Sequence, residues 1–187
     1  GTAYVNKDAG FANLEESDIL AGVLVRRFVA DEVEVVIGPA VAGALFARDV
    51  ARELQGLTAI KIRPVYAEKS EVGDTFVIKR GYGTLIAGKN VLVVEDILTT
   101  GGSVKKVIEA TRAVGGNVVG VGALCNRGGI TAADLGLDRG RLEALVNIAL
   151  DAWDESECLR VGPCSRGVPI NTDVGKGREF LARRRLI

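Results

Sequence analysis

Short apolar runs alternate along this chain with stretches whose apolar residues recur at helical spacing. Buried strands are predicted for the runs at 33–37, 57–65, 91–94, 118–125 and 145–150. Helices are predicted at 41–54 and about 104–114, and an earlier one after Asn13, which with Glu16 resembles a capping box. Strands that alternate with helices imply right-handed crossovers. We therefore expect an α/β fold with a mainly parallel central sheet flanked by helices.

The 187 residues suffice for one domain with a sizeable core but not for two. We expect that core at about 30–150. Residues 1–13 have the pattern of an extended or loop segment, and residues 151–187 change in character, with Trp153, two cysteines and the glycine-rich stretch 168–177. Both end segments are predicted to form a small cap over the sheet.

The segment 91–103 carries the strongest chemical signal. Its apolar run ends in Glu95 and Asp96, and Thr99, Thr100, Gly101, Gly102 and Ser103 follow before the helical pattern begins. Hydroxyls and closely approaching N–H groups at a helix N-terminus suit a phosphate. Paired carboxylates suit the vicinal hydroxyls of a ribose or a metal-bound water. The pattern favours a phosphorylated sugar, whereas its structural alternative is a strand–loop–helix turn whose acids cap the helix.

These thirteen consecutive residues resemble the phosphoribosyl-pyrophosphate motif of the type I phosphoribosyltransferases. The resemblance implies that family's fold, with Glu95 and Asp96 on the ribose hydroxyls and residues 99–103 on the 5′-phosphate. It also implies Mg²⁺ held mainly by substrate and water, with no direct protein ligand. By contrast, Gly83–Lys89 has P-loop spacing but precedes a strand and is followed by Asn90 instead of Ser or Thr. We interpret it as a turn.

Among these enzymes the chain is most similar to the orotate phosphoribosyltransferases. Gly38–Gly43 resembles their pyrophosphate loop, with Ala42 and Gly43 contributing backbone contacts alone because no lysine is present there. The polar stretch 66–80 resembles their catalytic loop, in which Lys69 would reach across a homodimer to screen pyrophosphate. The alternatives are an ordinary strand–helix turn for the first and an exposed charged hairpin for the second.

Two further residues extend this resemblance. Arg127, 28 residues after Thr99, would orient the orotate carboxylate, since paired arginine–carboxylate hydrogen bonds suit that role. A structural arginine at a strand end is the alternative. Lys7 lies in a segment, Tyr4–Asp8, that resembles the family's N-terminal segment, where it would approach the base or pyrophosphate.

Composition narrows the function further. The chain has 24 basic and 24 acidic residues, so we expect no general attraction to nucleic acid or to a membrane. Histidine is absent, which excludes Ser–His triads and imidazole acid–base catalysis. Cys125 is predicted to be a buried small hydrophobe. Cys158 and Cys164 do not match a zinc-knuckle spacing, and reduced thiols in a cytoplasmic protein are the favoured interpretation.

The expected reaction transfers the phosphoribosyl group from phosphoribosyl pyrophosphate to orotate, giving orotidine 5′-phosphate and pyrophosphate. Asp96, Glu95 and Lys69 are its candidate catalytic residues. Three alternatives remain open at this level. One is a purine phosphoribosyltransferase in which Arg127 is structural, the second is a non-catalytic regulator that senses phosphoribosyl pyrophosphate, and the third is an inactive paralogue.

Overall fold

The structure is a computed structural model that describes residues 3–138, 140–151, 153–175 and 177–184. Its strands are β1 (Val35–Pro39), β2 (Arg63–Lys69), β3 (Phe76–Val77), β4 (Asn90–Leu98), β5 (Asn117–Asn126) and β6 (Arg141–Asn147). Its α-helices are α1 (Lys7–Phe11), α2 (Leu14–Val25), α3 (Ala42–Leu57), α4 (Tyr82–Ile86), α5 (Gly102–Ala113), α6 (Glu155–Arg160) and α7 (Gly177–Arg184). Two 3₁₀ turns, η1 (Val29–Asp31) and η2 (Pro163–Arg166), complete the described elements.

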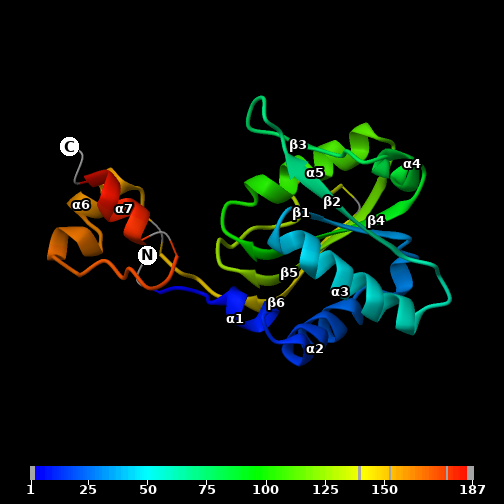
Figure 1. Ribbon diagram of the computed structural model, residues 1–187, viewed down its shortest axis with the longest axis horizontal. Coiled ribbons are helices and arrows are strands. Elements are labelled where there is room, and N and C mark those ends of the chain that lie inside the picture. The colour runs from blue at the N-terminus through cyan, green and yellow to red at the C-terminus, as the bar shows by residue number, and fades with distance from the viewer. Residues whose placement is uncertain (1–2, 139, 152, 176, 185–187) are drawn as a thin grey trace. The chain divides into compact units, whose positions relative to one another are not determined.

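The described strands form one six-stranded sheet in the order β3-β2-β1-β4-β5-β6. Every neighbouring pair is parallel except β2 and β3, which form an antiparallel hairpin. The strand order reverses between β1 and β4: the chain leaves β1 through α3 towards β2, and leaves β4 through α5 towards β5 (Figure 1). In a parallel sheet, ligands bind at the carboxyl ends of the strands on either side of such a reversal.

A hydrophobic core lies on each face of this sheet. Helices α2 and α3 cover one face and α4 and α5 cover the other, as Figure 1 shows. Strand β4 serves both cores, because Val91 and Val93 pack on the α5 side while Leu92 and Val94 pack on the α3 side. A strand buried on both faces reads as a continuous apolar run, which is why the sequence reveals it. The predicted, mainly parallel sheet flanked by helices is confirmed.

Several predicted boundaries were wrong. Helix α3 continues to Leu57, and β2 begins only at Arg63, because its register is fixed by the pairing of Val35 with Arg63. Strand β6 begins at Arg141, where polar and apolar residues alternate along a sheet edge and no apolar run marks the start. Segment 1–13 is not wholly extended, since α1 forms at Lys7–Phe11.

The P-loop-like stretch was also assigned incorrectly in part. Its first residues belong to the short helix α4, and a turn with Gly88 at φ 71° leads from there into β4. Its N–H groups do not open onto the carboxyl edge of the sheet, so the rejection of a phosphate-binding role agrees with the fold.

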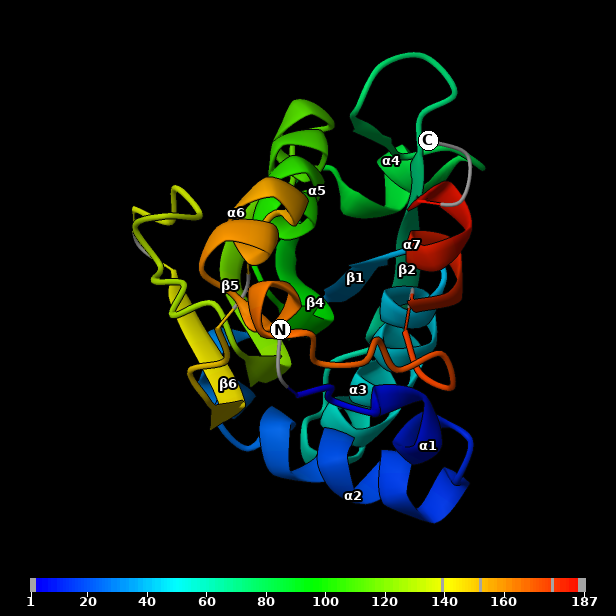
Figure 2. The same ribbon diagram turned by 90° about the vertical axis from the view of Figure 1, so that its left-hand side faces the viewer.

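The chain divides into two compact units. Residues 7–148 contain the sheet, whereas residues 1–6 and 149–187 form the other unit. In that second unit α6 packs against η2, and Tyr4 lies against Gly175 (Figure 2 shows the same fold from the side). Within the described residues, no helix is both long enough and apolar enough to cross a membrane. A cap over the sheet formed by the second unit stays a prediction.

Candidate active site

The two predicted acids lie inside β4 and not after it. The strand continues through Leu98 because Ile97 and Leu98 still pair with Cys125 and Asn126 of β5. Successive side chains of a strand point to opposite faces. Glu95 therefore follows Val93 towards the α5 side, and Asp96 follows Val94 towards the α3 side.

The surroundings of these two carboxyl groups differ. Lys7 of α1 forms an ion pair with Asp96, which is 5 % exposed. Glu95 is 8 % exposed, and its Oε1 accepts a hydrogen bond of 3.2 Å from the backbone N–H of Asp96. Burial, reinforced by the nearby charge of Asp96, raises the pKa of Glu95 to about 8. Glu95 is therefore largely protonated at neutral pH, beside the carboxyl group of Asp96 that pairs with Lys7.

The loop after β4 presents donors at the N-terminus of α5. Gly101 has a φ of 72° and precedes the helix, which begins at Gly102, while Thr99 and Thr100 are exposed. The N–H groups of the first helical turn have no acceptor within the helix and can bind an anion, although that of Gly102 also donates to Thr100 Oγ1 at 3.4 Å. A Cβ atom at Gly101 would come within 2.9 Å of Leu135 Cδ2. Glycine is thus required here by both conformation and packing.

The loop after β1 forms a second set of donors at the N-terminus of α3. A Cβ atom at Gly38 would lie 2.2 Å from the carbonyl oxygen of Gly43, so the two ends of this loop are in direct backbone contact. Ala42 and Gly43 form the first turn of α3, and Val41 before them is exposed. Since β1 and β4 are neighbours, the two helix N-termini open at the same edge of the sheet.

Arg127 lies at this edge, directly after β5. Its backbone N–H donates to the carbonyl of Leu98 at 2.9 Å. Its Nε is buried without a hydrogen-bond partner among the described residues. A buried donor that lacks an acceptor is costly, and a bound anion would relieve that cost.

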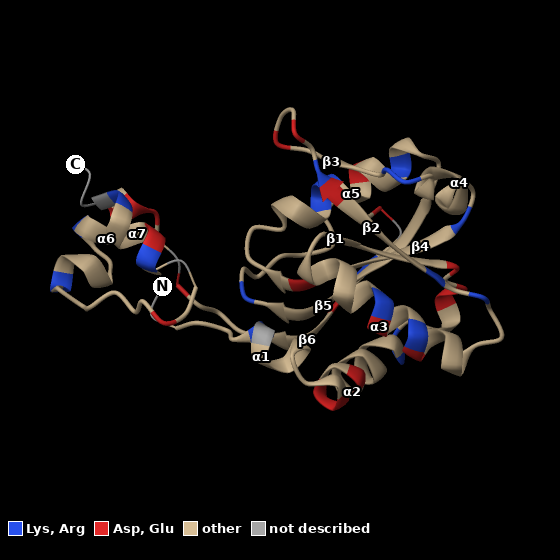
Figure 3. Ribbon diagram, in the orientation of Figure 1, with Lys and Arg blue, Asp and Glu red and all other residues tan. Residues whose placement is uncertain are grey.

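Lys69 does not lie with Asp96 in this structure. It ends β2 instead of lying in the following loop, and its Nζ is 3.9 Å from Asp74 Oδ1 in the β2–β3 hairpin. Asp74 also forms an ion pair with Lys106 of α5, and this pairing lowers the pKa of Asp74. Figure 3 shows basic and acidic segments side by side where the hairpin meets α5. Lys106 was not among the residues predicted from the sequence, although it lies about one helical turn after the phosphate motif.

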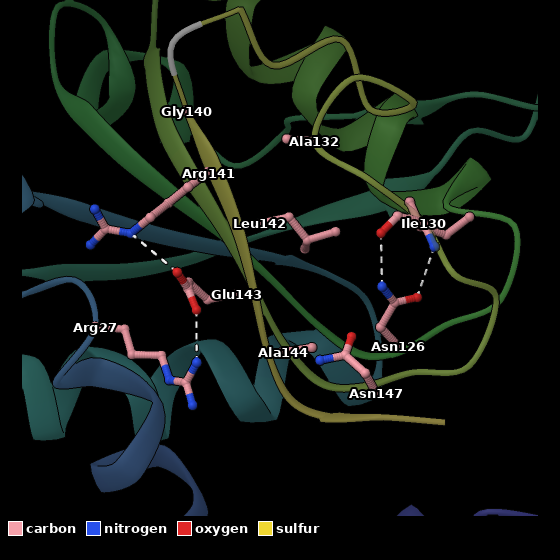
Figure 4. Close-up of a pocket in the computed structure, with 10 residues that line it drawn as sticks. All are labelled: Arg27, Asn126, Ile130, Ala132, Gly140, Arg141, Leu142, Glu143, Ala144 and Asn147. Atoms are coloured by element: carbon pink, nitrogen blue, oxygen red, sulfur yellow. Dashed lines mark hydrogen bonds and ion pairs between the residues drawn. The ribbon is translucent and has the colours of Figure 1, made fainter. Parts of the chain in front are cut away.

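The structure also contains a pocket of ≈ 390 Å³, and none of Glu95, Asp96 and Arg127 lines it. It follows edge strand β6, where Glu143 pairs with Arg27 at 2.8 Å and lies 3.7 Å from Arg141 (Figure 4). Both guanidinium groups are engaged by a carboxylate, and neither the loop after β1 nor the loop after β4 lines this pocket. The candidate active site is therefore the edge beside β1 and β4.

For a metal, the relevant observation is the set of donors at that edge. No cluster of three or more Asp, Glu, Cys or His side chains able to hold a metal ion occurs among the described residues. Asp96, with Glu95 beside it, is the acid at the sheet edge. This donor set fits a cation that is held chiefly by substrate oxygens and water, as Mg²⁺ commonly is.

Comparison with known proteins agrees with this geometry. The family model of the phosphoribosyl transferase domain matches residues 14–153. The orotate phosphoribosyltransferase of Caldanaerobacter subterraneus subsp. tengcongensis is 36% identical over 155 residues, which are 82% of this chain and 73% of the relative. That of Thermotoga maritima is 34% identical over 174 residues, 93% of this chain and 84% of the relative.

Among solved structures, the orotate phosphoribosyltransferase of Mycobacterium tuberculosis H37Rv, in complex with Fe(III) dicitrate, superposes with a TM-score of 0.60. It is 26% identical, and the match covers 77% of this chain and 79% of that one. Sequence and fold thus lead to the same group of enzymes. The chain belongs to the phosphoribosyltransferase family and, within it, to the orotate phosphoribosyltransferases.

Proposed function

We propose that this protein transfers the phosphoribosyl group of phosphoribosyl pyrophosphate to orotate, releasing pyrophosphate. The observation that supports this most is the joint opening of two helix N-termini, those of α3 and α5, beside the buried carboxylate of Asp96. Two anion sites on either side of a carboxyl group match a sugar that carries phosphate groups at two positions.

In this arrangement, both phosphate-bearing ends of phosphoribosyl pyrophosphate would have binding partners. Thr99, Thr100 and the N–H groups of Gly101, Gly102 and Ser103 would bind the 5′-phosphate. The backbone of Ala42 and Gly43 would bind the pyrophosphate. Asp96 would accept hydrogen bonds from the ribose hydroxyls, while Lys7, which pairs with it, would lie close to the substrate. Glu95, protonated near neutral pH, would complete the hydrogen bonds around the diol.

The reaction separates charge, because departing pyrophosphate leaves positive charge on the ribose ring. Positioning and preorganised electrostatics therefore supply most of the rate enhancement. Mg²⁺, bound through substrate oxygens and water near Asp96, would supply additional neutralisation of the pyrophosphate charge. Lys69 would approach the leaving group when the β2–β3 hairpin closes, and Arg127 would hold the carboxylate of orotate with its guanidinium group.

The test is a set of parallel assays with Mg²⁺ and phosphoribosyl pyrophosphate. Orotate should be consumed, whereas adenine, hypoxanthine, xanthine and uracil should not. Consumption of a purine in place of orotate would overturn the choice of base but leave the transfer chemistry. Binding of phosphoribosyl pyrophosphate without turnover of any base would indicate a regulator or an inactive paralogue.

We further propose that the enzyme is a cytoplasmic homodimer in which Lys69 serves the partner's site. Lys69 lies beside Asp74, on a strand that β1 separates from the strand of Asp96. This position supports a role for Lys69 in the site of the partner subunit. Sedimentation equilibrium tests the dimer. Mixing the impaired variants Lys69→Ala and Asp96→Asn then tests whether Lys69 acts in the partner's site, because hybrid dimers would contain one intact site. Activity that does not rise after mixing would assign Lys69 to its own subunit.

A further inference from the structure

The side chain of Asn126, at the end of β5, closes the loop that carries Arg127. Its Nδ2 donates to the carbonyl of Ile130 at 2.8 Å, and its Oδ1 accepts from the N–H of Ile130 at 3.0 Å (Figure 4). Both hydrogen-bonding groups of the amide are thus used on one residue four positions later. Asn126 is only 6 % exposed, so water competes little for these bonds.

The loop closed in this way lies directly on the predicted phosphate loop. A Cβ atom at Gly128 would be 1.6 Å from the carbonyl oxygen of Thr99, which means that the two backbones touch. Ile130 Cγ2 would lie 3.3 Å from a Cβ atom at Gly101. The position of loop 127–130 is therefore coupled to the position of the donors at the N-terminus of α5.

The guanidinium group of Arg127 depends on that backbone. Its Nε has no hydrogen-bond partner among the described residues, whereas its backbone N–H is held by the carbonyl of Leu98. Because no hydrogen bond from a described residue holds Nε, the position of the backbone on either side sets which space the guanidinium group can reach. That backbone is fixed at one end by β5 and at the other by the paired hydrogen bonds to Asn126.

We infer that Asn126 is a positioning residue for recognition of the acceptor base. It holds loop 127–130 against residues 99–101, so that Arg127 is oriented towards a carboxylate-bearing base before that base arrives. Preorganisation of this kind lowers the KM for the base, since less ordering is left to binding. The inference rests on the proposed function, because it assumes that Arg127 binds the carboxylate of orotate.

The matched control lies on the same strand. Asn117, at the amino end of β5, also uses its side-chain amide in a hydrogen bond, donating to Asn90 at 2.8 Å. In Asn126→Ala the KM for orotate should rise about tenfold or more, as loss of about 1.4 kcal/mol of binding predicts. The kcat and the KM for phosphoribosyl pyrophosphate should change less than about twofold. Asn117→Ala should leave all three parameters unchanged.

Two further variants guard against a loss of folding. Asn126→Asp keeps the acceptor for the Ile130 N–H but loses the donor, and Asn126→Gln keeps both groups on a longer side chain. Both should give intermediate KM values for orotate, and amide hydrogen exchange at Ile130 should accelerate in parallel. An unchanged orotate KM in whichever variants fold would overturn the positioning role. If the unsubstituted chain does not use orotate, the proposed function fails, and this role fails with it.

A separate observation concerns the second unit. Cys158 in α6 and Cys164 in η2 have their sulfur atoms in contact, and the N–H of Cys164 lies 3.3 Å from Cys158 Sγ. Gly162 holds the intervening turn, because a Cβ atom there would lie 2.8 Å from the Cα of Cys158 and 3.1 Å from Trp153. Both cysteines are thiols in the structure, as expected from the sequence, and the structure adds the contact between their sulfur atoms.

We propose that Cys158 and Cys164 form a reversible disulfide bond. With a small-molecule disulfide such as oxidised glutathione, one thiolate would attack and release one glutathione thiolate, and the second cysteine would then displace the other. Two cysteine protons are lost, one disulfide is formed and one is reduced, so the exchange balances. The product would link α6 covalently to η2.

Trypsin provides a direct test, because Arg160 lies between the two cysteines. After exposure of the full chain to oxidised glutathione, digestion without reductant should yield two peptides joined through Cys158 and Cys164, and reductant should separate them. Cys164→Ser should abolish that species. Cys125 serves as the internal control, since it is buried in β5 and burial raises the pKa of its thiol. A persistent glutathione adduct on either cysteine, without the joined peptides, would overturn the proposal.

Discussion

Lys7 and Asp96, separated by 89 positions in the chain, form an ion pair at the carboxyl edge of the sheet. This contact joins helix α1 to β4. It also distinguishes Asp96 from its neighbour Glu95, whose pKa is raised by burial and by the charge of Asp96. Two adjacent acids that look equivalent in the sequence thus lie in different environments: Asp96 pairs with a lysine, and Glu95 is buried with a raised pKa.

Asp96→Asn should reduce kcat/KM for phosphoribosyl pyrophosphate by about 100-fold or more, because it removes a carboxyl acceptor at the proposed site of charge development. Steady-state kinetics at varied concentrations of phosphoribosyl pyrophosphate would measure this loss. Glu34→Gln is the matched control. It also removes an acid paired with a lysine, Lys89 at 2.8 Å, but at the start of β4. Equal losses in both variants would contradict a specific role for Asp96.

Glu95→Gln should have its largest effect on the pH dependence of stability. The carboxyl group of Glu95 titrates near its usual value of 4.5 in the unfolded chain and at about 8 in the fold. Between these values the folded state binds more protons, so the free energy of unfolding falls as pH rises from about 4.5 to about 8. The glutamine variant lacks this loss, and its advantage over the parent in thermal melts should grow across that window.

Activity of the same variant provides a second measurement. Glutamine has the shape of a protonated glutamate, so turnover at pH 6.5 should change far less in Glu95→Gln than in Asp96→Asn. A melting advantage that does not vary with pH would show that Glu95 is already ionised in the fold.

Gly101→Ala should weaken the phosphate loop through both conformation and packing. The residue has a φ of 72°, and the added methyl group would lie 2.9 Å from Leu135 Cδ2. We expect the free energy of unfolding to fall by about 2–4 kcal/mol, because the left-handed backbone is strained by a side chain and the packing is too tight for a methyl group. Gly129→Ala isolates the strain, because Gly129 has a φ of 65° and nothing within 4 Å of a Cβ atom. Urea unfolding of both variants should show the larger loss for Gly101→Ala.

Lys69→Ala should lower kcat by about 100-fold while leaving the KM for orotate nearly unchanged, because the lysine is expected to act on the leaving group in the transition state. Pre-steady-state measurement of pyrophosphate release would isolate that step. Lys79→Ala removes an exposed lysine just after β3 of the same hairpin and should be neutral. A fall confined to the KM for orotate in Lys69→Ala would argue against this role.

The sequence was informative where one residue pattern has one structural solution. The doubly buried strand β4 needs apolar residues at every position from Val91 to Val94, so it is visible as an uninterrupted run. Gly101 after it can be predicted because a left-handed backbone before a helix favours glycine. Edge strand β6 gave no such signal, since Arg141 and Glu143 alternate there with Leu142 and Ala144.

The sequence by itself determined the sheet, the phosphate motif and the family, because local patterning and a thirteen-residue motif require no knowledge of distant contacts. The tertiary structure alone decided how the parts of the site differ from one another. It paired Asp96 with Lys7, buried Glu95 so that it keeps its proton, and placed Lys69 at Asp74. Charge state and orientation depend on neighbours brought together by folding, and no local pattern contains them.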